Sequence, residues 1–225
     1  MKSGVDELLD SLRKSPGGPV FNPWWESDRE NDDYSNSAEI RRHQLKFYVQ
    51  ERLGRKPYLL LGEALGYQGG HFTGIAMTSE RLLLGHLEKR GLKPEFVFIG
   101  MQPSRTSRVE VRKDGFSEPT ATIVWNHLLG LGLNPFDFII WNAFAWHPYN
   151  PKKGMLSNRT PTPAEFSFGQ SVLQKFIKLV EPRQIVAVGE KASLLLNEAG
   201  YGHEKVRHPA NGGAGKFREQ FSALL

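Results

Sequence analysis

Short apolar runs alternate with longer segments of helical spacing along most of this chain. The runs at 58–61 (YLLL), 136–141 (FDFIIW) and 184–188 (QIVAV) have the length of buried strands and are too short for helices. Apolar residues at helical spacing predict helices at about 37–53, 79–89, 120–131, 164–180, 191–200 and 216–224. Strands that alternate with helices are typical of an α/β protein whose parallel sheet is covered on both faces.

Three segments depart from this alternation. The run at 95–100 (EFVFIG) fits a further strand or an extension, and 101–118 is basic and poorly periodic, which indicates an inserted loop. Residues 1–35 are interpreted as a peripheral extension, with a helix at about 5–13 and tryptophans that pin the chain to the main body. At 225 residues, without internal repeats, the chain is expected to form a single domain.

The composition excludes several classes of chemistry. The sequence has no cysteine, so disulfides, thiolate nucleophiles and cysteine-ligated zinc or iron–sulfur clusters are excluded. There is no run of about eighteen apolar residues, and acidic residues interrupt the apolar ones that follow Met1. We therefore expect no membrane segment and no secretory signal, and a cytoplasmic protein.

The distribution of charge favours a polyanionic partner. The formal net charge is +5, and much of the positive charge gathers in a few segments, most of them expected to be loops. These basic residues are Arg105, Arg108, Arg112, Lys113, Lys152, Lys153, Lys205, Arg207, Lys216 and Arg218.

A glycine-rich loop follows the first strand, at 62–74 (GEALGYQGGHFTG). Its glycines let the backbone turn sharply and approach a ligand, and it carries Glu63, His71 and Phe72 at the carboxyl end of a strand, where open α/β sheets bind ligands. A plain turn is the alternative, with Phe72 in the core and Glu63 capping the next helix. A phosphate-binding loop is a further alternative, but the lysine-serine ending of that motif is absent.

Three segments, taken in order, resemble motifs of the uracil-DNA glycosylase superfamily. They are 62–74, 141–148 (WNAFAWHP) and 207–213 (RHPANGG), and 159–163 (RTPTP) is similar to that family as well. The resemblance implies a three-layer α/β/α sandwich with a central, mainly parallel four-stranded sheet. It also implies a DNA-repair enzyme that flips uracil, or a related deaminated base, out of the duplex and hydrolyses its bond to the sugar.

The resemblance assigns roles to particular residues. Phe72 would stack on the base, with Gly62 and Tyr67 beside it, and Asn142 would read its pairing edge, because one amide can both accept from N3–H and donate to O4 of uracil. His208 would stabilise the negative charge on the departing base, and Glu63 is the candidate carboxylate for the attacking water.

The chain departs from the best-known branch of that family in its first motif. Where that branch has an aspartate this chain has Ala64, and Leu65 and Gly66 replace the usual proline and tyrosine. Exclusion of the thymine methyl group would then fall to Tyr67 or Phe72. The opening Gly-Glu resembles the branch with an iron–sulfur cluster, but without cysteine the chain is placed in a cysteine-free branch, with no metal and no cofactor.

The last motif is expected to face DNA. Residues 208–213 would present a small wedge that includes Asn211, while Lys205, Arg207 and Lys216 would meet phosphates. The expected partner is DNA that contains uracil or another deaminated base, bound by a monomer. A catalytically silent DNA-binding member of the same fold is the alternative, because Ala64 replaces the water-activating carboxylate. The preferred base and strand form stay open.

Overall fold

The computed structural model describes residues 3–225, and four parallel strands form its central sheet. In spatial order these are β3 (Phe138–Phe144), β2 (Tyr58–Ala64), β5 (Gln184–Val188) and β6 (Glu204–Val206). All three pairings are parallel, and β3 is buried at every position. Apolar runs this continuous are typical of parallel strands covered on both faces. The predicted fold class is confirmed.

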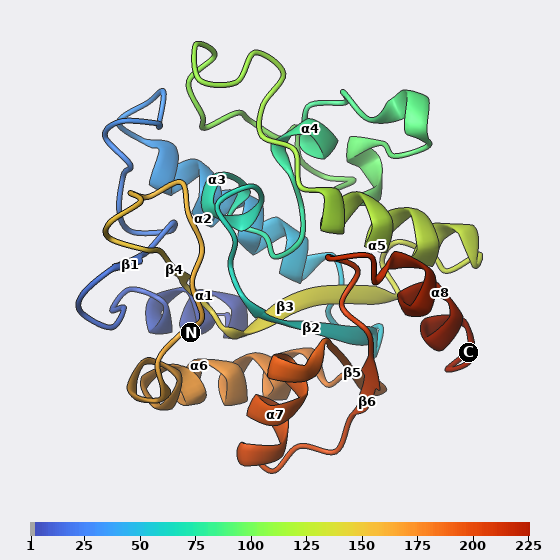
Figure 1. Cartoon of the computed structure of the whole chain (residues 1–225). Coiled ribbons are helices and arrows are strands. Elements are labelled where there is room, and N and C mark those ends of the chain that lie inside the picture. Colours follow the sequence, from blue (N-terminus) through green and yellow to red (C-terminus); the bar gives the residue numbers. More distant parts are fainter. Residues whose placement is uncertain (1–2) are drawn as a thin grey trace.

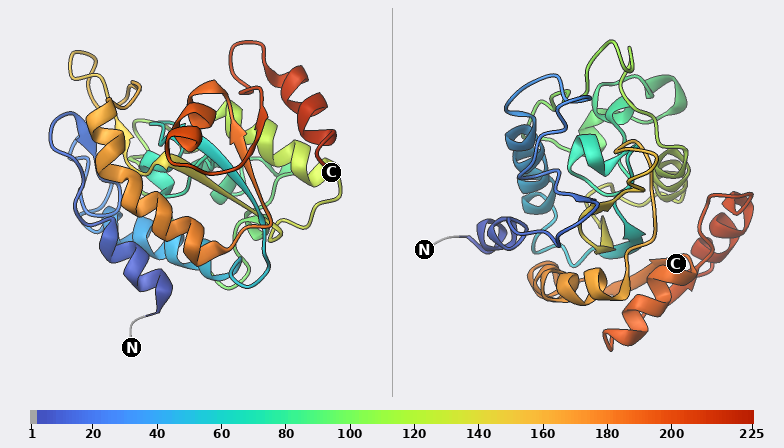
Figure 2. Two further views of the ribbon diagram at one scale, coloured as in Figure 1. Left: turned by 90° about the horizontal axis from the view of Figure 1, so that it is seen from below. Right: turned by 60° about the vertical axis from the view of Figure 1, so that its left-hand side comes forward.

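Helices cover both faces of this sheet. Figure 1 shows α2 (Ser37–Gln50) and α5 (Pro119–Gly130) above the sheet, with α6 (Pro163–Val180) and α7 (Glu190–Glu198) below it. The two views of Figure 2 show the same layers, with α6 running along the sheet. The remaining helices are α1 (Gly4–Ser11), α3 (Gly70–Thr73), α4 (Glu80–Leu83) and α8 (Ala214–Ser222).

The start and end of α6 follow from local chemistry. The Thr162 hydroxyl accepts from the backbone N–H of Glu165, and the Glu165 carboxylate accepts in return from the N–H of Thr162, which is a capping box. Pro163 occupies the first turn, where its missing N–H costs nothing. The helix ends at Val180 because Glu181 adopts a left-handed conformation, with φ of 48°.

The N-terminal segment contributes side chains to the main core. In α1, Val5, Leu8 and Leu9 are buried, and β1 (Val20–Phe21) pairs antiparallel with β4 (His147–Pro148). Trp24 is fully buried, and its indole N–H donates to the Gly74 carbonyl at 3.1 Å. The chain ahead of α2 is therefore fixed against the glycine-rich loop.

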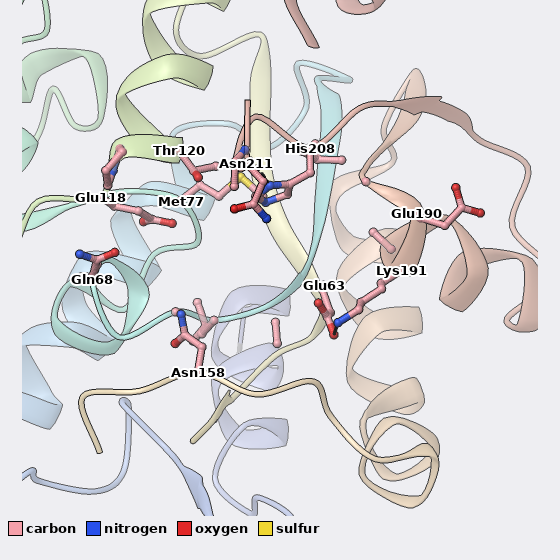
Figure 3. A pocket seen from close by; sticks show the side chains of 18 of the residues that line it. Glu63, Gln68, Met77, Glu118, Thr120, Asn158, Glu190, Lys191, His208 and Asn211 are labelled. Carbon is pink, nitrogen blue, oxygen red and sulfur yellow. Dashed lines mark hydrogen bonds and ion pairs between the residues drawn. The ribbon is translucent and has the colours of Figure 1, made fainter. Parts of the chain in front are cut away.

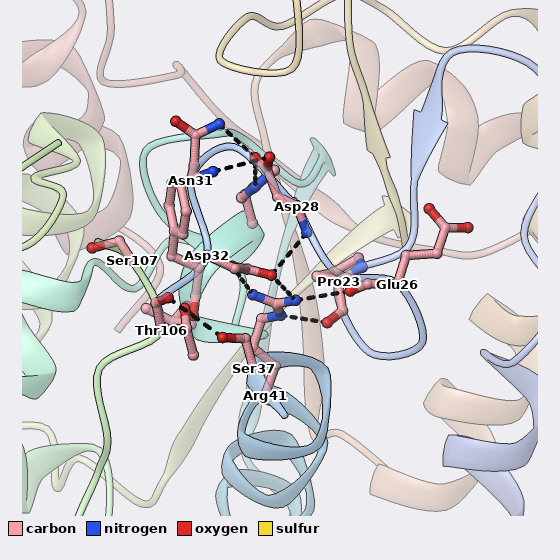
Figure 4. Close-up of polar contacts among 12 residues, drawn as sticks. Pro23, Glu26, Asp28, Asn31, Asp32, Ser37, Arg41, Thr106 and Ser107 are labelled. Carbon is pink, nitrogen blue, oxygen red and sulfur yellow. Dashed lines mark hydrogen bonds and ion pairs between the residues drawn. The ribbon is translucent and has the colours of Figure 1, made fainter. Parts of the chain in front are cut away.

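A buried ion pair fastens this segment to α2 (Figure 4). The Arg41 guanidinium contacts both carboxylate oxygens of Asp32, at 2.7 and 3.0 Å, and also donates to the carbonyls of Pro23 and Glu26. The Asp28 N–H donates to Asp32 at 2.8 Å. Two-point contact of this kind makes a guanidinium–carboxylate pair strong and fixes its orientation.

The segment between α4 and α5 differs in part from the sequence-based expectation. The predicted helix at 79–89 is α-helical only over α4, because Gly85 takes φ of 79° and turns the chain. The run at 95–100 does not form a strand; it begins with the 3-10 turn η2 (Pro94–Phe96), after η1 (Glu88–Arg90). The rest is the expected loop, held by the buried Glu80 carboxylate, which accepts from the N–H groups of Thr106 and Ser107 at 3.0 Å.

No helix within residues 3–225 combines the length and the apolar character needed to cross a membrane.

Candidate active site

A cleft of about 540 Å³ opens at the carboxyl ends of the parallel strands. Its walls come from the end of β2, the starts of α5 and α7, and the loop that follows β6 (Figure 3). The lining side chains that carry polar or ionisable groups include Glu63, Gln68, Glu118, Asn158, Lys191, His208 and Asn211. A parallel sheet places ligand sites at this edge, because the loops that leave its strands meet there.

Gly62 and Asn142 face each other on adjacent strands, next to the cleft but outside its lining. They are register partners of β2 and β3. A Cβ on Gly62 would lie 2.5 Å from Oδ1 of Asn142 and 2.5 Å from Cε of Met77. The glycine thus makes room for an amide and a thioether. Asn142 is almost fully buried, and the Met77 side chain beside it lines the cleft.

His208 enters the cleft from the loop after β6. A Cβ on Gly189, which has φ of 100°, would lie 3.0 Å from Cβ of His208, so glycine is required at the turn where β5 ends. The Ala210 N–H donates to Nδ1 of His208 at 3.1 Å. Burial, with the charge of Arg207 as a second cause, lowers the pKa of His208 below its usual value. The neutral ring therefore carries its proton on Nε2, as a hydrogen-bond donor.

Glu63 lies next to Gly62 on β2 and is paired with a cation. Its Oε1 is 3.4 Å from Nζ of Lys191, in the first turn of α7, and Lys191 also contacts the Thr160 hydroxyl. The Glu63 side chain is 28% exposed, which leaves it accessible from the cleft. The structure thus brings Glu63 and His208 to one cleft.

Glu118 lies on the other side of the cleft and was not singled out from the sequence. It precedes α5, and Figure 3 shows it opposite Lys191. Its Oε2 is shielded from solvent and has no hydrogen-bond partner within the described chain. Burial raises the pKa of this carboxyl to about 7. In the sequence, the one local feature that could have pointed to Glu118 is the Glu-Pro pair just before a predicted helix. That glutamate ends the segment 101–118, which was interpreted as a loop.

The structure does not bring Phe72 to the cleft. The ring is fully buried and stacks on Phe116, with centroids 4.2 Å apart and an angle of 17° between the planes. Phe72 is a core residue here, and the expectation that it stacks on a base is corrected. Tyr67 is also outside the cleft lining, although its backbone N–H donates to the lining residue Asn158 at 3.0 Å. The side chain that lies against Asn142 from the loop is Met77.

The residues expected to meet DNA lie together beside the cleft. Lys205, Arg207 and Lys216 line an adjoining hollow of about 440 Å³, and Arg207 borders the cleft as well. Lys205 is paired with Glu190 at 2.8 Å. Asn211 lines the cleft itself and takes a left-handed conformation, with φ of 51°, at the tip of the loop after β6.

Comparison with known proteins identifies the family of this chain. The family model described as the Uracil DNA glycosylase superfamily matches residues 89–224, more than half of the chain. The chain belongs to the uracil-DNA glycosylase superfamily. Among solved structures, wild-type SMUG2 of Pedobacter heparinus is similar, with a TM-score of 0.63 and 16% identity, over 100% of this chain and 99% of that one. This likeness concerns the fold. No curated protein matches the sequence.

Membership of the uracil-DNA glycosylase superfamily supports, at family level, a DNA glycosylase that cleaves N-glycosidic bonds. The matched range begins at residue 89, so it does not include the first motif, where Ala64 was expected to replace an aspartate. Ala64 lines the cleft with a methyl group. The ionisable groups that line the cleft come from other positions.

Proposed function

We propose that this protein is a DNA-repair glycosylase that releases uracil, or a related deaminated base, from DNA by hydrolysis. One observation carries the proposal: Glu63 and His208 line a single cleft at the carboxyl edge of the sheet, and the Asn142 amide lies beside Met77, which lines the same cleft. The cleft volume of about 540 Å³ falls within the roughly 300–1,000 Å³ range of small-molecule sites, enough for a flipped nucleotide.

Asn142 is the proposed reader of the base. A side-chain amide can accept from N3–H and donate to O4 of uracil, whereas cytosine presents an acceptor and a donor at the corresponding positions. Gly62 leaves the space in which this amide lies. Met77, in place of Phe72, is proposed to contact the face of the base, because its polarisable thioether forms favourable contacts with flat rings.

His208 is the proposed stabiliser of the leaving base. Cleavage of the bond to the sugar leaves the electron pair on the base, and an Nε2–H donor that is already in place favours that charge. The Ala210 N–H on Nδ1 fixes the ring and its tautomer before substrate binds. Glu63 and Lys191 carry opposite charges on the same wall, which suits contact with a polar base or a sugar of developing charge.

The DNA backbone would cross the basic hollow next to the cleft. Lys205, Arg207 and Lys216 supply positive charge there, and Asn211 projects from the loop that would approach the extruded nucleotide. We propose that the protein acts as a monomer, in the compartment that holds the DNA, the cytoplasm in a bacterium.

A catalytically silent DNA-binding role is the second candidate, and Ala64 is the observation in its favour. A panel of oligonucleotides separates the two candidates, each with one uracil, hypoxanthine, xanthine or mismatched base. Release of the free base by purified protein supports the glycosylase. Intact oligonucleotides throughout the panel, bound but uncut, support the silent role.

Two variants test the assigned residues. Asn142→Ala should abolish uracil release without changing the thermal midpoint by more than a few degrees, and Asn197→Ala, exposed near the end of α7, is its control. His208→Ala should lower the single-turnover rate by about 100-fold or more while binding to uncleavable DNA stays within about twofold. His86→Ala, an exposed histidine, is the control for this change.

A further inference from the structure

Hydrolysis of an N-glycosidic bond requires more than recognition of the base. As the bond breaks, the sugar gains cationic character and a water must bond to C1′, and a nearby carboxylate serves both needs in glycoside cleavage. Ala64 offers no carboxylate in the first motif, so the carboxylates that line the cleft are the candidates for this role. The charged or titratable groups that line it are Glu63, Glu118, Arg159, Glu190, Lys191, Arg207 and His208.

Two of the three carboxylates are already paired with cations. Glu63 has Nζ of Lys191 at 3.4 Å, and Glu190 has Nζ of Lys205 at 2.8 Å. Glu118 has no such ion pair within the described residues, and its Oε2 makes no hydrogen bond there. Oε1 of Glu63 also lacks a hydrogen bond, but it faces the Lys191 ammonium group.

A structural role does not account for Glu118. It occupies the N-cap position of α5, where a carboxylate often accepts from backbone N–H groups, yet its side chain makes no capping hydrogen bond. The shielded Oε2 has no hydrogen bond to offset its loss of contact with water, which is unfavourable for folding. Burial also raises its pKa to about 7, the range in which a group both takes and gives protons at neutral pH.

The chain makes room for this carboxylate with a glycine. A Cβ on Gly69 would lie 1.9 Å from Oε2 of Glu118, so no other residue at position 69 leaves the carboxylate where it is. Gly69 comes directly before α3, in the glycine-rich loop. The loop and the start of α5 together hold the carboxylate in the wall opposite Lys191 (Figure 3).

We infer that Glu118 is the catalytic carboxylate of this chain and takes a proton from the attacking water in place of the group missing at Ala64. The inference rests on the proposed function. The water oxygen bonds to C1′ of the deoxyribose while the bond from C1′ to the base nitrogen breaks, and that electron pair leaves with the base. The water proton passes to Glu118, which later releases it to solvent. The base anion, held by His208, takes up a proton from solvent, which leaves free base and an abasic site.

Single-turnover release of uracil tests the inference, with Glu118→Gln as the main variant and Glu95→Gln, an exposed glutamate of η2, as the matched control. Glu118→Gln should slow release by 100-fold or more, while its affinity for an oligonucleotide with a tetrahydrofuran abasic analogue stays within about twofold. The wild-type rate should rise with pH and level off above about 7, since the ionised carboxylate is the active form. This rise with pH should be absent in Glu118→Gln. Glu118→Ala, which removes the group entirely, should regain part of its rate with added formate.

The outcomes are distinct. Uracil release by Glu118→Gln at the wild-type rate overturns the role of Glu118 and leaves the glycosylase proposal standing. Equal losses in rate and in affinity assign Glu118 to binding and overturn its catalytic role as well. Failure of the wild-type protein to release any base from the panel overturns both proposals.

Discussion

His71 and His147 lie in the interior with their Nδ1 atoms 3.0 Å apart. His147 donates from Nε2 to the Ser157 carbonyl at 2.8 Å, so in the neutral ring Nδ1 is the acceptor that faces His71. Asp28 Oδ2 is 3.1 Å from Nε2 of His71. Burial, with the neighbouring His71 as the second cause, lowers the pKa of His147 to about 3. These side chains join residues from the N-terminal segment, the glycine-rich loop and β4.

This pair predicts a loss of stability in mild acid. Between pH 6.5 and 3 the unfolded chain carries a proton on His147 that the folded protein does not, so the free energy of unfolding falls as the pH falls. One such proton corresponds to about 1.4 kcal/mol per pH unit. Urea unfolding at pH 7, 6 and 5 measures the slope. The slope should be smaller in His147→Gln than in wild type and unchanged in His86→Gln, the exposed control. Equal slopes in the wild-type protein and both variants would contradict the prediction.

Gly62→Ala is expected to impair base release with little effect on folding. The new Cβ would meet Oδ1 of Asn142 and Cε of Met77 at 2.5 Å, and both are far ends of flexible side chains that can move away. The displaced amide would no longer match uracil, so we expect release at least about tenfold slower and a thermal midpoint within a few degrees of wild type. Gly202→Ala, with open space around its Cβ, is the control. An unchanged rate in Gly62→Ala would remove Asn142 from the proposed recognition.

Removal of charge from the basic hollow should weaken DNA binding in a salt-dependent way. For Arg207→Gln and for Lys216→Gln we expect a lower affinity for duplex DNA and a slope of log K against log salt that is smaller by about 0.9 per lost phosphate contact. Fluorescence anisotropy at several salt concentrations measures both quantities. Lys89→Gln, in η1, should leave the slope unchanged. If all three variants share the wild-type slope, the DNA runs elsewhere.

The ion pair of Asp32 with Arg41 should matter more than any surface pair. Both side chains are almost fully buried, so Asp32→Ala leaves an uncompensated guanidinium in the interior and should cost about 3–5 kcal/mol in the free energy of unfolding. Asp114→Ala breaks the half-exposed pair with Arg81, for which about 0–1 kcal/mol is expected. Urea unfolding of the two variants compares these losses. Similar values would mean that the buried pair does not anchor the N-terminal segment.

Local sequence patterns predicted much of the framework. The apolar run at 58–61 became the first part of β2, and 184–188 became β5, because a continuous apolar stretch of this length is stable only with both faces covered. The helix predicted at 79–89 was too long, since the spacing of apolar residues does not reveal that Gly85 adopts a positive φ. At 95–100 an apolar run lacked a neighbouring strand with which to pair.

The sequence by itself determined the parallel α/β sandwich, the membership in a superfamily, and the placement of Asn142 and His208 at or after strand ends, because each depends on short stretches of chain and on their order. Only the tertiary structure decided which loop side chains face the cleft. Phe72 packs against Phe116, and Glu118 lies over Gly69. Both contacts join residues far apart in the chain, and the packing of a loop against distant residues is set by the shape of the whole core rather than by its own pattern.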